Sequence, residues 1–198
     1  MTAILLVIVA YLIGSVSFAV VASRIFKLPD PRTYGSGNPG ATNVLRTGHK
    51  PAAVVTLIGD FAKGAIAVFL ATVVTSMYDV PAWTIPAVAL GVFVGHILPV
   101  FHGFLGGKGV ATAAGVVLAL HWPLGLALVV IWLTIAFGFR VSSLAALVAA
   151  LVAPIGAFYS LGNTLTAWTM VPISLLLFWR HSGNIRQLFS GQERRIGR

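Results

Sequence analysis

Seven apolar segments, separated by short polar breaks, dominate this sequence and leave few folds open to it. The 198 residues are 58% hydrophobic and only 9% charged, whereas roughly a quarter of the residues in an ordinary soluble domain are charged. The segments are residues 3–23, 53–76, 82–101, 110–121, 123–139, 143–160 and 164–180. The sequence therefore predicts an all-α polytopic membrane protein, with residues 1–198 forming a single domain of seven transmembrane helices.

Two of these segments have unusual ends or lengths. Residues 110–121 are too few to cross about 30 Å of hydrocarbon at about 1.5 Å per residue. We expect a short helix whose amino end faces a cavity. Residues 3–23 follow no basic region and stay apolar for longer than the core of a signal peptide, so we expect a retained first span.

The basic residues predict how the chain is oriented. Lysines and arginines near the ends of spans stay on the cytoplasmic side. If the amino end lies in the periplasm and the carboxyl end in the cytoplasm, all the lysines and arginines except Lys63 fall on the cytoplasmic side. These residues are Arg24, Lys27, Arg32, Arg46, Lys50, Lys108, Arg140, Arg180, Arg186, Arg194, Arg195 and Arg198. The net charge of +9 then reflects a cytoplasmic face among membrane lipids, and no nucleic-acid partner is expected.

All polar, glycine-bearing stretches fall on that one side. They are residues 34–46, 102–112, 139–144 and 180–194. Backbone that is not helical is tolerated at membrane depth only where protein or a water-filled cavity satisfies its N–H and C=O groups. These stretches together indicate a shared polar pocket.

The stretch GGKGVAT has features of a phosphate site. Gly106, Gly107 and Gly109 allow backbone N–H groups to approach a ligand, Lys108 adds a positive charge, and a helix follows. The stretch is not a Walker A loop, because His102 and Gly109 stand where that pattern needs glycine and serine or threonine. A tight interfacial turn with a lysine that anchors topology remains an equal alternative.

Two further stretches offer hydrogen bonds and cations. In SGNPGATNVLR, the side chains of Ser36, Asn38, Thr42 and Asn43 are neutral, and Arg46 presents a planar fork suited to phosphate. A solvated turn with a topology-setting arginine is the alternative.

In RHSGNIR, His181 and Asn184 are three residues apart and would share one face of a helix. A lone histidine at an interface is more often structural than functional.

Other polar residues indicate support rather than chemistry. Asp60 and Lys63, three apart within a span, can form an ion pair, and His96 can tie down backbone freed by Pro99. The chain has no cysteine, four acidic residues and no HxxxH or HExxH spacing, so we expect no metal site and no cofactor.

The motifs together resemble a known family. GSGNPGATNVLR (35–46), DFAKG (60–64), GHILPVFHGFLGGKGVAT (95–112) and HSGNIRQLFSGQE (181–193) are similar to those of the bacterial membrane acyl-phosphate:glycerol-3-phosphate acyltransferases. The resemblance covers essentially the whole chain. One departure is Gln187 before Leu188, where the family usually has arginine, so that Arg186 stands one place early.

The resemblance implies a reaction and a location. An acyl group would pass from acyl phosphate to the sn-1 hydroxyl of glycerol 3-phosphate, giving lysophosphatidic acid and phosphate in the first acylation of phospholipid biosynthesis. The protein would act as a monomer in the bacterial inner membrane, with its active site on the cytoplasmic face. It would be linked functionally to the enzyme that forms acyl phosphate.

The resemblance also implies roles for individual residues. We expect catalytic roles for Ser36, Arg46, His181 and Asn184. Substrate-binding roles are expected for Asn38, Thr42, Asn43, Gly106, Gly107, Lys108, Gly109, Thr112, Arg140 and Ser143. Asp60, Lys63, His96 and Glu193 would give structural support, with Glu193 pairing with neighbouring arginines. His181 is the candidate base, although a substrate phosphate oxygen is the favoured alternative.

Two non-enzymatic functions stay open at this point. A transporter for an organic phosphate would also need basic, glycine-rich breaks, but the sequence shows no internal repeat of the kind common in transporters. An assembly factor that holds anionic lipid would explain the charge, but it would not explain the glycines and asparagines.

Overall fold

The structure is a computed structural model that describes residues 1–196, so the predicted placement of Arg198 lies outside the described residues. All the regular structure in this part of the chain is helical. The elements are α1 (Thr2–Ser15), α2 (Phe18–Ile25), α3 (Ala41–Leu45), α4 (Lys50–Met77), α5 (Thr84–Ile97), the 3₁₀ turn η1 (Val100–His102), α6 (Val110–Leu120), α7 (Trp122–Phe139), α8 (Ser142–Leu161), α9 (Leu165–Arg180) and α10 (Ser182–Phe189).

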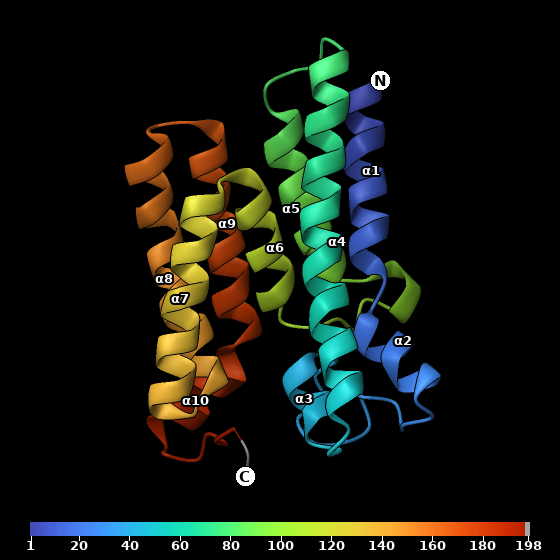
Figure 1. Ribbon diagram of the computed structural model, residues 1–198, viewed down its shortest axis with the longest axis vertical. Helices are drawn as coiled ribbons and strands as arrows, with labels where there is room; N and C mark the ends of the chain where they lie inside the picture. The colour runs from blue at the N-terminus through green and yellow to red at the C-terminus, as the bar shows by residue number, and fades with distance from the viewer. Residues whose placement is uncertain (197–198) are drawn as a thin grey trace.

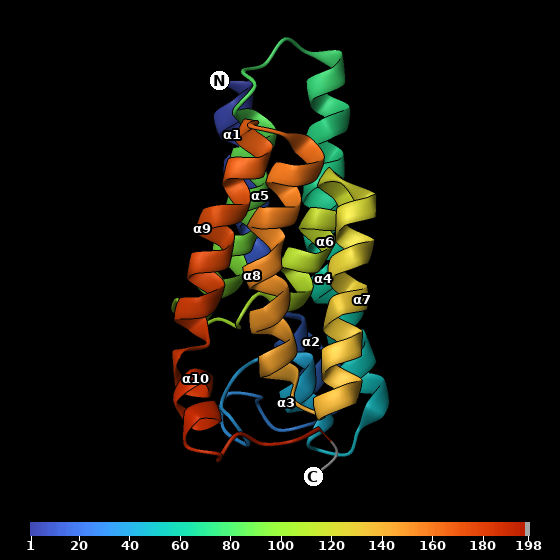
Figure 2. The same ribbon diagram turned by 90° about the vertical axis from the view of Figure 1, so that its left-hand side faces the viewer.

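The long helices form two groups with a short helix between them. Helices α1, α4 and α5 stand together on one side, and α7, α8 and α9 on the other (Figure 1). The short helix α6 packs on both α4 and α7. The amino terminus lies at one end of the molecule, and α2, α3, α10 and the C-terminal segment lie at the other (Figures 1 and 2). The polar stretches of the sequence therefore gather at or toward one end.

Within residues 1–196, four helical segments are long and apolar enough to cross a membrane. They are α4, α5 extended through η1, α7 and α8. The bent pair of α1 and α2 makes a fifth, and α6 and α9 are apolar but shorter. The all-helical membrane fold and the short helix after the glycine loop are thus confirmed. The number of seven spans remains a prediction.

The first apolar segment is not the continuous helix that was expected. Val16 and Ser17 are extended, and the two helices that flank them are bent by 42°. The break leaves a backbone carbonyl without its helical partner, and the ammonium of Lys63 donates to this Val16 oxygen at 2.7 Å. Hydropathy did not reveal the break because the residues on both sides of it are apolar.

Glycines allow close contact between neighbouring helices. A Cβ atom at Gly115 of α6 would lie 2.1 Å from the Phe61 carbonyl oxygen of α4, and one at Gly64 of α4 would lie 2.3 Å from the Thr112 carbonyl oxygen of α6. Small residues that let backbones approach are typical of helix packing in membranes. The contact fixes α6, and with it the loop before α6, against α4.

Candidate active site

The segment between α2 and α3 is organised around the Asn43 side chain. Asn43 is buried, and its amide donates to the carbonyl oxygens of Pro31, at 2.8 Å, and Tyr34, at 3.2 Å. Its Oδ1 accepts from the backbone N–H of Ser36, at 2.9 Å, and from the Arg46 guanidinium, at 3.3 Å. Asn43 therefore holds both residues of this motif that were expected to be catalytic, Ser36 through its backbone and Arg46 through its side chain.

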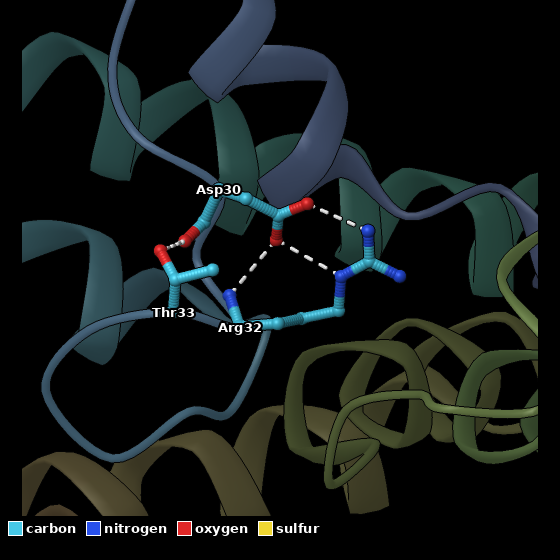
Figure 3. A network of polar contacts seen from close by, with 3 residues as sticks. All are labelled: Asp30, Arg32 and Thr33. Carbon is cyan, nitrogen blue, oxygen red and sulfur yellow. Dashed lines mark hydrogen bonds and ion pairs between the residues drawn. The ribbon is translucent and has the colours of Figure 1, made fainter.

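A second small network shapes the start of this segment. The Asp30 carboxylate accepts from the backbone N–H and from the guanidinium of Arg32, and the Thr33 hydroxyl donates to the Asp30 carbonyl (Figure 3). The hydrogen bond from the Arg32 side chain, the largest cause, lowers the pKa of Asp30 to about 2. The turn is thus held by a charge-assisted contact at neutral pH.

The glycine loop, defined here as residues 103–109, is held from two sides. The Arg180 guanidinium donates to the carbonyl oxygens of Gly107, at 3.0 Å, and Gly106, at 2.6 Å. From α5, the His96 carbonyl accepts the Gly107 N–H at 3.2 Å. In this loop the N–H groups of Gly103, Gly106, Lys108 and Gly109 have no partner among residues 1–196. These N–H groups, rather than that of Gly107, are therefore available to an anion.

Gly109 ends this loop in a conformation that favours glycine. Its φ is +84°, and it is the N-cap of α6. A Cβ atom there would also lie 2.3 Å from the Phe93 ring. A residue with a side chain would strain the turn that brings Lys108 into the site.

A chain of polar side chains joins the loop to the C-terminal part of the protein. The Lys108 ammonium donates to Asn184 Oδ1, and Asn184 Nδ2 donates to Glu193 Oε1 at 2.7 Å. The Ser143 hydroxyl donates to the same carboxylate oxygen at 2.6 Å. Residues from the glycine loop, α8, α10 and the segment after α10 thus meet at one place.

The charges at this place are mainly positive. Burial, the largest cause, lowers the pKa of Lys108 to about 8, and the charges of Arg46 and Arg180 act in the same direction. Glu193 opposes them. Burial also lowers the pKa of Arg46, with Arg194 adding to the effect. Because Lys108 and Arg180 are partly buried and Arg46 adds a third positive charge, an anion bound here would be stabilised.

His181 lies beside this cluster and is buried. Its Nδ1 is 2.8 Å from the Leu177 carbonyl oxygen, so Nδ1 carries the proton and Nε2 is the basic nitrogen. Burial, together with Lys108 and Arg180, lowers the pKa of His181 to about 4. The imidazole is therefore neutral at pH 7.

Several predicted contacts differ in the structure. Thr112 is fully buried, and its hydroxyl donates to the Asp60 carbonyl at 2.9 Å, so it faces α4 rather than open space. Within residues 1–196 Glu193 forms no ion pair with an arginine; its Oε1 accepts from Ser143 and Asn184 instead. The reason is that the C-terminal segment folds back under α8 and α10.

The remaining predicted residues lie around the cluster. Ser36 and Thr42 are exposed and Asn38 is half-buried. Arg140 caps the end of α7 in a left-handed conformation, φ +58°, and its carbonyl accepts from the Ile196 N–H.

The predicted ion pair between Asp60 and Lys63 is present at 2.9 Å. The Nδ1 of His96 lies 3.6 Å from the same Asp60 oxygen.

Arg180 is the residue whose importance the sequence did not reveal. The sequence places it at the end of an apolar segment and near His181 and Asn184, but it was not among the predicted site residues. Its position next to His181, at the start of a motif rich in polar residues, was the available signal.

Comparisons with known proteins agree on one family. The family model described as glycerol-3-phosphate acyltransferase matches residues 4–191. The chain belongs to the glycerol-3-phosphate acyltransferase family. Proteins named glycerol-3-phosphate acyltransferase from Burkholderia cenocepacia and Burkholderia multivorans are 56% and 57% identical over 200 and 199 residues, covering 100% of this chain and 92% of each relative.

Solved structures of the family agree with the fold as well. The structure is similar to the crystal structure of PlsY (YgiH), an integral membrane glycerol 3-phosphate acyltransferase, in its glycerol 3-phosphate form. The TM-score is 0.92 and the identity 38%, over 100% of this chain and 96% of the other. The lysophosphatidic acid form of that protein gives a TM-score of 0.89 over the same shares of both chains. The prediction of an acyltransferase is confirmed.

Proposed function

We propose that this protein transfers an acyl group from acyl phosphate to the sn-1 hydroxyl of glycerol 3-phosphate, giving lysophosphatidic acid and phosphate. The observation that carries the proposal is the convergence of Arg46, Lys108 and Arg180 with loop N–H groups, among them those of Lys108 and Gly109, that have no partner within residues 1–196. Both substrates carry a phosphate, and cations with backbone N–H groups are the donors that bind phosphate best. Family membership, and the ligands named for the related crystal structures, point to the same acceptor and product.

The reaction needs positioning more than activation. The acceptor hydroxyl oxygen attacks the acyl carbonyl carbon, the bond from that carbon to the phosphate oxygen breaks, and phosphate leaves with the electron pair. Holding two reactants in line can supply roughly 7–11 kcal/mol, and cations near the carbonyl and the departing phosphate stabilise the developing charge. Lys108 is the side chain best placed for this second role, because it reaches the cluster from the glycine loop.

The hydroxyl proton is best accepted by a phosphate oxygen of the substrate. A base works most efficiently when its pKa lies near the working pH, and the pKa of His181, about 4, is too low. The leaving phosphate gains a more basic oxygen as the bond breaks. His181 and Asn184 would then orient the acceptor, as would Ser36 and Arg46 across the site.

The proposal includes an orientation in the membrane. We place the amino end in the periplasm of a bacterial inner membrane, with seven passes of one domain and the site on the cytoplasmic face. The support is that the basic residues lie mostly at the end of the molecule that carries α2, α3, α10 and the C-terminal segment (Figure 1).

The first experiment compares donors. Purified protein is incubated with labelled glycerol 3-phosphate and either palmitoyl phosphate or palmitoyl-CoA, without added metal, and the lipid products are separated. We expect labelled lysophosphatidic acid from the acyl phosphate alone. Product only from the CoA thioester would overturn the donor, and uptake of glycerol 3-phosphate into vesicles without acylation would indicate a transporter.

A pair of lysine variants ties the activity to the site. Lys108→Ala removes the ammonium at the cluster and should lower kcat/KM by 100-fold or more, in keeping with the loss of a charged contact in the transition state. Lys50→Ala, at the exposed start of α4, is the matched control and should change kcat/KM by less than about twofold.

A further inference from the structure

Three buried polar residues lie outside the contacts proposed for the substrates. Asp60 and Lys63 on α4 are each 3% exposed, and His96 on α5 is 7% exposed. Lys63 Nζ is 2.9 Å and His96 Nδ1 is 3.6 Å from the same Asp60 oxygen. Burying an ion pair costs several kcal/mol in desolvation, and such residues inside a membrane are usually functional. A purely apolar contact would hold α4 and α5 together at a lower cost.

Each member of this trio also contacts a segment that leads to the site, Lys63 through its side chain and Asp60 and His96 through their backbone carbonyls. Lys63 donates to the Val16 carbonyl, where the first apolar segment breaks. The Asp60 carbonyl accepts from Thr112, in the first turn of α6. The third contact is made by His96, whose carbonyl accepts from Gly107 in the glycine loop.

The imidazole of His96 is packed directly against that loop. A Cβ atom at Gly107 would lie only 2.2 Å from His96 Nε2, and one at Gly106 only 2.2 Å from the His96 carbonyl oxygen. The ring therefore lies between the Asp60 carboxylate and the loop backbone. A change in the rotamer or position of His96 would move the backbone that carries Lys108.

We propose that Asp60, Lys63 and His96 are positioning residues that fix the glycine loop, its free N–H groups and Lys108 for substrate binding. They touch neither substrate. Asp60 and Lys63 orient the His96 ring, and His96 sets the loop. The inference rests on the proposed function for its kinetic consequence, but the tie between His96 and the loop is independent of any reaction.

Hydrogen exchange in the substrate-free protein tests the tie itself. In detergent, His96→Leu should speed amide exchange in peptides covering residues 103–109 at least tenfold, because the imidazole that packs against Gly107 is lost. Thr84→Val is the matched control: Thr84 is fully buried on the same helix, but its hydroxyl bonds the Pro81 carbonyl at the opposite end, and the loop should exchange as in the wild type. Unchanged loop exchange in His96→Leu would overturn the proposal.

If His96→Leu does not fold, Thr112→Val takes its place. It is nearly isosteric and removes only the bond to the Asp60 carbonyl. It should also speed exchange in the loop, although less, and an unchanged loop would again count against the proposal.

Kinetics separate positioning from general stability. His96→Leu should raise the KM of the one substrate whose phosphate the loop binds at least fivefold and leave the other KM within about twofold. His96→Gln, which keeps a polar side chain facing Asp60, should recover at least half of the lost kcat/KM. Equal changes in both KM values, or a loss that follows the folded fraction alone, would reduce the trio to structural support. If the wild-type protein makes no product, the proposed function fails, and hydrogen exchange still decides the tie.

Discussion

Lys108 couples the charge of the site to pH. Its folded pKa is lowered from 10.5 to about 8, so the ammonium is present below pH 8 and is lost as pH rises through that value. If the cation binds a substrate phosphate, kcat/KM should fall with an apparent pKa near 8, because this parameter reports the free enzyme. A pH profile measured with acyl phosphate at low concentration checks this.

The Lys108→Arg variant is the control for that profile. A guanidinium stays charged in this range but has a different shape, so activity should be lower and the alkaline decline should disappear. An alkaline decline that is the same in both proteins would assign it to another group. The stability of the wild-type protein should change in the opposite sense to its activity. Between pH 8 and 10.5 the unfolded chain binds more protons at Lys108 than the folded chain does, so the free energy of unfolding should rise with pH.

His181 should not behave as a general base. With a pKa of about 4 the ring is neutral from pH 5 to 8, and a base contributes a factor of about 10²–10⁴. His181→Gln, which keeps a neutral hydrogen-bonding side chain, should therefore lower kcat by less than about tenfold and raise the KM of glycerol 3-phosphate. The acid sides of the two kcat/KM profiles should superimpose. A loss of 100-fold or more in kcat would restore His181 as the base.

Single residues were predictable where their chemistry is local. Asn43 and Arg46 stand three apart in one motif, and they are in contact. Asp60 and Lys63 have the same spacing and pair as expected. Glu193 is different, since its partners lie 9 and 50 residues away. No spacing rule reports a contact made only when two helices and a terminal segment fold together.

Among the helices, the contact between α4 and α6 fixes the position of α6, which begins directly after the glycine loop. Gly115→Ala places a methyl group 2.1 Å from a backbone oxygen of α4, so the two helices must separate. Overpacking of this kind costs about 1–3 kcal/mol. We expect a lower melting temperature in detergent and lower activity than in the wild type.

Gly138→Ala gives the matched comparison. It is also a helical glycine, near the end of α7, but a Cβ atom there meets nothing within 4 Å. Alanine is favoured over glycine in a helix by about 0.5–1 kcal/mol, so this variant should be as stable as the wild type or more stable. Equal destabilisation by both substitutions would show that the α4 contact is not tight.

Helices were predicted well where polar residues bound them. The segments 123–139 and 143–160 match α7 and α8 within one residue at each end, because Arg140 and the polar residues around it interrupt the apolar pattern. The break at Val16 and the helix α3 were missed. Hydropathy gives no signal for either: α3 has only five residues, and the break, where Lys63 contacts the Val16 carbonyl, lies between apolar residues.

On the scale of the whole molecule, the site is assembled from both groups of helices. Arg46 follows α3, which packs on α4, while Arg180 ends α9 and Asn184 lies on α10. The glycine loop lies between α5 and α6 (Figure 1) and contacts Arg180 at the end of α9, so it joins the two sides. Relative movement of the two groups would change the spacing of the cations, which is why the contacts of short α6 matter for the chemistry.

The orientation of the molecule can be tested directly, because the chain has no cysteine. Single cysteines at Asp79, between α4 and α5, and at Ser190, after α10, are both at exposed positions. If the basic face is cytoplasmic, a membrane-impermeant maleimide should label Asp79→Cys on intact spheroplasts and Ser190→Cys only after lysis. Asn163→Cys, exposed between α8 and α9, should behave like Asp79→Cys, because four of the seven proposed passes lie between the two positions. The reverse labelling pattern would put the phosphate site outside the cell. If Asp79→Cys and Ser190→Cys were labelled from the same side, an even number of passes would have to lie between them instead of the five proposed.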